Sequence, residues 1–169
     1  MSAARVTSEI GRLRTVLVHA PGAEVDRMVP NMMEQLLFDD ILFGEHARVE
    51  HGVFTKVLQK LGIEVLDVQK LLEETLLIDQ ARRWLLTPML EVTSRPVAER
   101  LLAAPAEELA ATLAHGVRVN PDSVWLESEQ LFEVPPLPNW CFQRDPQAII
   151  GDQVIISAMA TPARWRPRT

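Results

Sequence analysis

The sequence contains a single cysteine, Cys141, and no long apolar run. One cysteine excludes an internal disulfide and a zinc site built on cysteine ligands. A membrane-spanning helix needs about eighteen consecutive apolar residues, and no such stretch occurs. The first residues, MSAARVTSEIGR, lack the apolar core of a secretory signal. These absences together predict a cytoplasmic protein.

Positive charge is also scarce, because 17 Lys and Arg residues stand against 23 Asp and Glu residues, for a net charge of −6. An acidic chain is a poor partner for a phosphate backbone or an anionic membrane surface, so we predict neither nucleic-acid nor membrane binding. His46 and His51 lie five positions apart, which is not the i, i+4 spacing of helical metal ligands. We therefore expect no metal site.

Apolar residues, in contrast, make up 47% of the 169 residues. This share excludes a disordered chain and supplies a core for one domain, or for one domain with an insertion. The first third has the order strand, helix, strand, over residues 13–19, 45–61 and 63–68, with Gly62 ending the helix. The helix is predicted from apolar residues that recur every four positions: Val49, Val53, Val57 and Leu61. This order indicates an α/β element.

The middle of the chain, residues 69–116, is rich in the helix formers Leu, Ala, Glu and Arg. Pro88, Pro96 and Pro105 divide it into pieces of helical length, and the last two suit helix starts. We expect Trp84 to pack inside this unit. The last part returns to β character, with a hairpin predicted around Gly151-Asp152.

The densest group of polar side chains is PNWCFQRDP, at residues 138–146. If this segment is a strand, Asn139, Cys141, Gln143 and Asp145 share one face. One interpretation is a strand that enters a turn, with Asp145 binding local backbone amides. The alternative is a substrate site, and the pattern leaves both open.

Several motifs, in this order, resemble the arginine deiminase family. The segment LPNWCFQRDPQAIIGDQVIISAM (137–159) is similar to the family pattern P-N-x-x-F-x-R-D-P followed by a Gly-containing hairpin. SEIGRLRTVLVHAPG (8–22) is similar to its opening strand, and GIEVLDV (62–68) to the following strand. LLFDDILF (36–43) and EHARVEHGVF (45–54) are similar to the loop and helix between them. Motifs in the right order are far more specific than one short match.

The resemblance implies an α/β fold of the pentein type, the pseudo-fivefold α/β propeller of guanidine-modifying enzymes, with an inserted helical unit. This chain would be a partial pentein. Residues 1–68 would form the first propeller module, 69–133 the inserted helical unit, and 134–169 the start of the next module.

The resemblance also implies a hydrolase of arginine catabolism, which converts L-arginine and water to L-citrulline and ammonia through a cysteine thiolate, without metal or organic cofactor. By position, Asp145 matches the aspartate that binds the guanidinium. Asn139 matches the asparagine at the amino-acid end of the substrate, and Arg164 the arginine that pairs with its carboxylate. Straight strand from Asn139 to Asp145 would span about 20 Å, so the segment must bend if both contact one ligand.

The family's nucleophilic cysteine lies in a Gly-rich motif, and its proton shuttle is a His-x-Asp pair; neither pattern occurs here. Cys141 lies between Trp140 and Phe142, where an inert core residue is expected. We therefore expect an N-terminal part of an arginine deiminase, inactive alone. A non-catalytic arginine-binding or interaction remnant, and a related enzyme such as an amidinotransferase, remain alternatives. Exposed strand edges favour a homo-oligomer.

Overall fold

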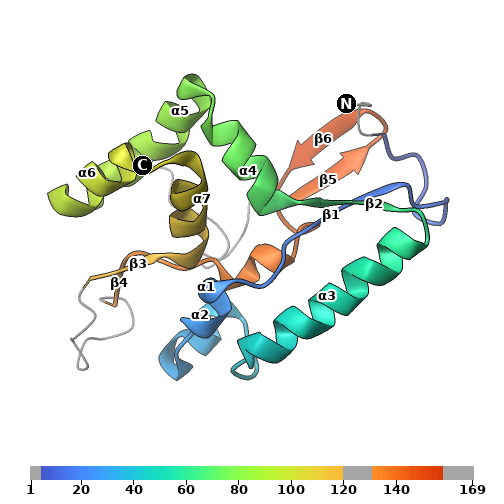
Figure 1. The fold of residues 1–169 in the computed structure, drawn as a ribbon, viewed down its shortest axis with the longest axis horizontal. Helices are drawn as coiled ribbons and strands as arrows, with labels where there is room; N and C mark the ends of the chain where they lie inside the picture. Colours follow the sequence, from blue (N-terminus) through green and yellow to red (C-terminus); the bar gives the residue numbers. More distant parts are fainter. Residues whose placement is uncertain (1–4, 120–130, 158–169) are drawn as a thin grey trace.

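The computed structural model describes residues 5–119 and 131–157 as a mixed α/β fold (Figure 1). Within these residues the strands form three separate two-stranded sheets. Helices supply most of the regular structure. The α/β class expected from the sequence is therefore confirmed.

The first strand, helix and strand are present as predicted. Strand β1 (Thr15–Val18) pairs in parallel with β2 (Glu64–Asp67), and the connection between them contains helix α3 (Gly44–Lys60). Gly62, at φ +75°, follows the helix end. A left-handed backbone of this kind suits glycine, which has no Cβ to clash.

Helix α3 does not bury the apolar stripe that predicted it. Its half-buried positions include Ala47, His51, Thr55 and Leu58. The predicted stripe is exposed, at 60% for Val49, 58% for Val53, 50% for Val57 and 65% for Leu61. The pattern identified the helix correctly but not the face that packs, because a two-stranded sheet covers only a narrow strip of a helix.

Four helices, α4 to α7, form a second packed group. They are α4 (Val68–Leu76), α5 (Asp79–Leu90), α6 (Arg95–Ala103) and α7 (Ala106–His115). Their core includes Leu86, Leu101 and Leu109, all at most 1% exposed. Burying such side chains stabilises a fold by about 2 kcal/mol each. This group, rather than the sheets, holds the larger apolar core of the described residues.

Two of the three proline predictions for this group are confirmed. Pro96 lies in the first turn of α6, and Pro105 is the N-cap of α7. Pro88 does not divide the chain, because it lies inside α5, two residues before the helix ends. So late in a helix, proline costs one hydrogen bond, here to the carbonyl of Trp84. The Trp84 side chain is 75% exposed, so its predicted packing role is also wrong.

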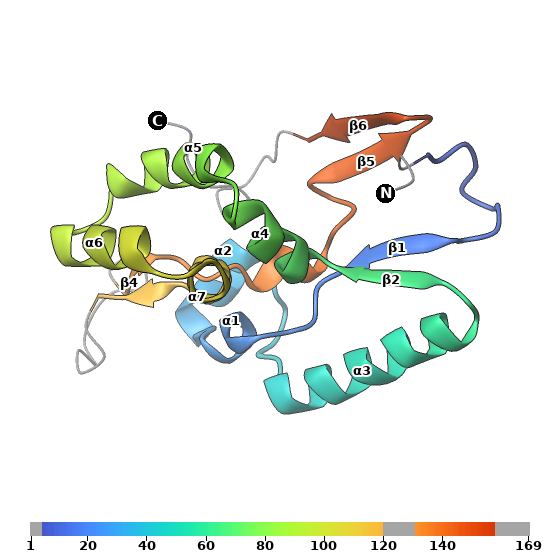
Figure 2. The same ribbon diagram turned by 45° about the horizontal axis from the view of Figure 1, so that its top comes forward.

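The remaining elements lie before and after these groups. They are α1 (Ala23–Asp26), η1 (Pro30–Met32), α2 (Met33–Leu36), β3 (Val117–Arg118), β4 (Phe132–Val134), η3 (Pro138–Cys141), β5 (Gln147–Ile150) and β6 (Gln153–Ile156). The hairpin of β5 and β6 turns at Gly151, as predicted. Figure 2 shows this hairpin on one side of the β1–β2 pair and α3 on the other.

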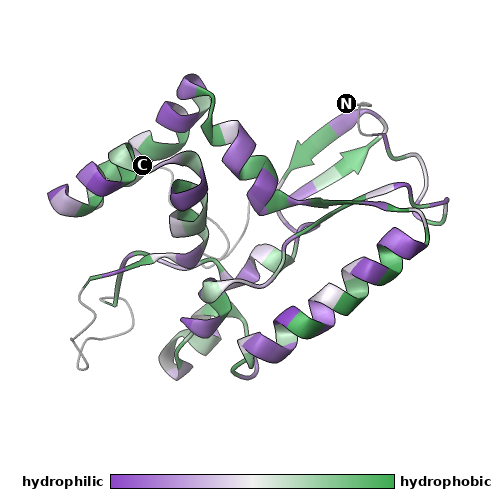
Figure 3. Cartoon of the chain, in the orientation of Figure 1, coloured by the Kyte–Doolittle hydropathy of each residue, from purple (hydrophilic) through white to green (hydrophobic). Residues whose placement is uncertain are grey.

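Apolar residues occur on the hairpin as well as on α3 (Figure 3). The exposed apolar residues of the hairpin include Ile150, Val154, Ile155 and Ile156. Exposed apolar strands favour association between chains, so a homo-oligomer stays a prediction. No helix in residues 5–119 and 131–157 is long and apolar enough to span a bilayer.

Candidate functional site

The PNWCFQRDP segment is a turn and not a strand. Residues Pro138–Cys141 form the 3-10 helix η3, and bends follow before β5 begins at Gln147. The predicted strand face shared by Asn139, Cys141, Gln143 and Asp145 is therefore wrong. The physical reason is local: Pro138 sets φ for a helical start and offers no N–H for a strand ladder. The chain does bend between Asn139 and Asp145, as a common ligand would require.

Asn139 is the anchor of this turn. It is 8% exposed, and its Nδ2 donates a hydrogen bond of 2.7 Å to the carbonyl of Leu36, which lies 103 positions earlier. Its Oδ1 atom is buried and accepts no hydrogen bond within the described residues. A buried acceptor without a donor is costly, so this atom is suited to receive a donor from a ligand.

Asp145 lies at the exposed end of the same turn. Its neighbour Arg144 forms an ion pair of 3.0 Å with Glu9, and both partners are mostly exposed. Arg164, the third residue of the predicted site, lies outside the described residues. The structure therefore places Asn139 and Asp145 on one turn. Asn139 is buried at the start of the turn, and Asp145 is exposed at its end.

Cys141 is exposed, so the expected core position is wrong. Its Sγ donates to the carbonyl of Pro138 at 3.6 Å, within the turn of η3. Trp140 takes the inner position instead, with its ring 4.5 Å from the ring of His19. In a 3-10 helix, with three residues per turn, positions two apart do not share a face, so Asn139 is buried while Cys141 is exposed.

Behind the turn lies a buried cluster that sequence reasoning missed. Glu24, 1% exposed, accepts through Oε1 from the backbone N–H of Gly22 at 2.6 Å and from His19 Nε2 at 3.1 Å. Its Oε2 lies 3.4 Å from Nε2 of His115, the last residue of α7. An acidic residue after a Pro-Gly turn is usually a surface residue, so only the fold reveals this cluster.

The surroundings of these groups shift their pKa values. Burial alone would raise the pKa of Glu24, but hydrogen bonds from His19 and the Gly22 N–H outweigh it and lower the pKa. Burial lowers the pKa of His115, and the nearby Glu24 carboxylate opposes this only in part. Burial likewise lowers the pKa of His51 on α3. At neutral pH the cluster therefore holds one buried carboxylate beside a neutral His115.

Acid is expected to destabilise the protein in two steps. Because the pKa of His115 in the folded chain lies below its ordinary 6.5, the unfolded chain binds more protons, and stability falls as the pH drops below 6.5. Glu24 adds a second loss below its ordinary value of 4.5, by the same sign. Urea unfolding at pH 7.5, 5.5 and 4 measures both steps. A combined His51→Gln and His115→Gln variant should lose the first step only; a first step of unchanged size would contradict the assignment.

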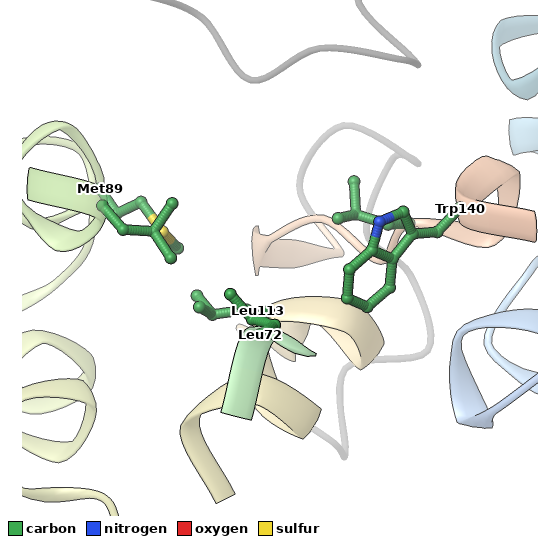
Figure 4. Close-up of a pocket in the computed structure, with 6 residues that line it drawn as sticks. Leu72, Met89, Leu113 and Trp140 are labelled. Atoms are coloured by element: carbon green, nitrogen blue, oxygen red, sulfur yellow. The ribbon is translucent and has the colours of Figure 1, made fainter. Parts of the chain in front are cut away.

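An apolar cavity of about 190 Å³ separates the turn from the helical group (Figure 4). Its wall is made by Leu72, Leu85, Met89, Leu113, Leu137 and Trp140. Trp140 thus contacts the cavity as well as His19. In residues 5–119 and 131–157 no group of three or more His, Cys, Asp or Glu side chains is arranged to hold a metal ion.

The family model described as arginine deiminase matches residues 34–168, about four-fifths of the chain. The chain belongs to the arginine deiminase family. Arginine deiminases from Limosilactobacillus fermentum and Pediococcus pentosaceus are both 39% identical to it, over 95% and 98% of the chain. The arginine deiminase of Listeria monocytogenes is 35% identical over 97% of it. The chain spans only 43–44% of the length of these relatives.

The resemblance to the arginine deiminase family is therefore confirmed. The matched range includes Asn139, Asp145 and Arg164, whereas His19 and Glu24 lie before it. Leu36 and Ala114, whose carbonyls accept hydrogen bonds from Asn139 and Leu137, also fall within that range.

Proposed function

We propose that this chain forms a substrate-binding part of an arginine deiminase site. In that reaction a cysteine thiolate attacks L-arginine, ammonia leaves, and water releases L-citrulline. The observation that carries the proposal is the position and hydrogen bonding of Asn139. Its side chain joins residues 138–146 to residues 36–43 through Leu36, and its buried Oδ1 has no donor among the residues that the structure describes.

Each end of arginine has a partner in this proposal. The exposed Asp145 carboxylate binds the guanidinium, whose planar fork of donors matches two carboxylate oxygens. Asn139 Oδ1 accepts from the α-ammonium, and Arg164 pairs with the substrate carboxylate. The fold would be a partial pentein, with propeller modules at residues 1–68 and 134–169 around a helical unit at 69–133.

We do not assign the nucleophile to Cys141. A cysteine nucleophile needs a neighbouring base or another group that stabilises the thiolate. The two histidines behind the turn, the buried His19 and the half-buried His115, lie against Glu24 instead. We therefore expect no citrulline from this chain alone. Multiple-turnover citrulline formation that Cys141→Ala abolishes would contradict this assignment.

Arginine binding tests the proposal directly. With one pocket wall formed by an exposed carboxylate, water competes for the ligand, and we expect a dissociation constant of about 1 mM or weaker. L-Arginine titrated into isotope-labelled protein should shift the NMR signals of the Asn139 side-chain amide and the Asp145 backbone amide. L-Citrulline, which lacks the guanidinium charge, should not.

Two variants give this experiment its controls. Asp145→Asn removes the carboxylate and should abolish the arginine-dependent shifts. Asp152→Asn makes the same change at an exposed position of the hairpin turn and should leave them intact. Shifts that are equal in all three proteins, or absent in the unmodified one, would contradict the proposal.

A further inference from the structure

The carboxylate of Glu24 joins the residues between β1 and α1 to the end of α7, which is distant in sequence. It lies in α1 and accepts from Gly22 in the preceding turn. It binds His19 just after β1 and lies against His115 at the end of α7. A carboxylate that is 1% exposed is tolerated only where such partners compensate its desolvation. The proposed arginine site does not use the side chains of Glu24, His19 or His115.

From this cluster one contact leads to the site. His19 has its Nε2 on Glu24 and its ring 4.5 Å from that of Trp140, at an interplanar angle of 41°. Trp140 directly follows Asn139 in η3, and its backbone N–H donates to Leu137 at 2.9 Å. The orientation of His19 therefore limits where the indole, and with it the Asn139 turn, can lie.

A second route reaches the same turn through α7. The backbone N–H of Leu137 donates to the carbonyl of Ala114 at 2.9 Å, next to His115. Arg27 Nη1 donates to the carbonyls of His115 and Gly116 at 2.8 and 2.6 Å. Glu24 thus contacts residues that hold the turn from two sides.

We propose that Glu24 is a positioning residue, which orients Asn139 for the arginine ligand through His19, Trp140 and the end of α7. The role of Asn139 in this inference rests on the proposed function. The coupling between Glu24 and the turn rests only on the contacts described above. Removing the carboxylate would free His19, and the turn would lose its fixed position while the helical core remains.

The Trp140 indole supplies a readout of whether His19 stays in position, because the two rings are in contact. If His19 moves away, the indole becomes more accessible to a quencher such as acrylamide. Other charged groups face the cluster: Arg27, which binds the carbonyls at the end of α7, His51 on α3, and Asp67, whose carboxylate accepts from Ala20 at 3.3 Å. These groups are unchanged in the variants below, so differences between variants report the cluster.

The experiment measures acrylamide quenching of Trp140 fluorescence at pH 7.5, without arginine, in a chain whose Trp84, Trp125 and Trp165 are replaced by Phe. Glu24→Gln should increase the quenching constant about twofold, because His19 no longer holds the indole in place, while the circular dichroism of the helices stays unchanged. Hydrogen exchange of the Asn139 side-chain amide should become about tenfold faster, because the turn opens more often. Glu74→Gln, an exposed change on α4, should alter neither.

Unchanged quenching and unchanged Asn139 exchange in a folded Glu24→Gln protein would overturn the proposal. If circular dichroism shows that this variant does not fold, His115→Ala replaces it, because it removes the contact of Glu24 with the end of α7 and leaves the carboxylate in place. Quenching of Trp140 should again increase about twofold, and unchanged quenching would overturn the proposal. Both readouts are free of ligand, so they hold or fail independently of arginine binding.

Discussion

Gly116→Ala is expected to lower the free energy of unfolding by about 3 kcal/mol or more. Gly116 follows α7 at φ +76°, a conformation that L residues rarely adopt. An added Cβ would lie 2.5 Å from the carbonyl oxygen of Val134, 2.6 Å from the nitrogen of Pro136 and 3.0 Å from the carbonyl carbon of Pro135. All three are backbone atoms, so no side-chain rotation relieves the clash.

Urea unfolding of this variant has two matched controls. Gly151→Ala introduces a similar positive φ, +64°, in open space, and should cost only about 1 kcal/mol of backbone strain. Gly52→Ala lies inside α3 with nothing within 4 Å of the new Cβ, and should raise stability by up to about 1 kcal/mol. A Gly116→Ala loss no larger than that of Gly151→Ala would show that the close backbone contact does not exist.

Leu109→Ala is the second change with a large expected effect. Leu109 is 0% exposed and lies in the core shared by α4 to α7. Truncation removes buried apolar surface and leaves a cavity, for a loss of about 2–5 kcal/mol. For a chain with a total stability of about 5–15 kcal/mol, this is enough to populate the unfolded state.

The control for Leu109→Ala lies in the same helical group. Leu102, on α6, is 55% exposed, and its replacement by alanine should change stability by less than about 1 kcal/mol. Both variants are compared by urea unfolding followed by circular dichroism. Equal losses in the two variants would mean that this group is not a packed core.

The local elements of the fold were largely predictable. The helix over residues 44–60, the turn at Gly151 and the start of α6 at Pro96 follow from periodicity, glycine and proline. The exceptions depend on surroundings. Pro88 is tolerated because α5 ends two residues later, and the exposed stripe of α3 reflects how little sheet covers it.

The candidate site was likewise predictable only in part. The polar residues of PNWCFQRDP were identifiable from their order, because adjacent residues necessarily stay together. Their conformation was not, since Pro138 begins a 3-10 turn where alternation suggested a strand. The exposure of Cys141 and the burial of Asn139 follow from that turn.

Composition, the proline and glycine positions and the motif order determined the class of fold, several element boundaries and the family. These properties are local, because they depend on the residues within a few positions along the chain. Only the tertiary structure decided that Asn139 binds the carbonyl of Leu36, and that Glu24 meets His115. These contacts join residues far apart in sequence, and no local pattern specifies which distant segments fold against each other.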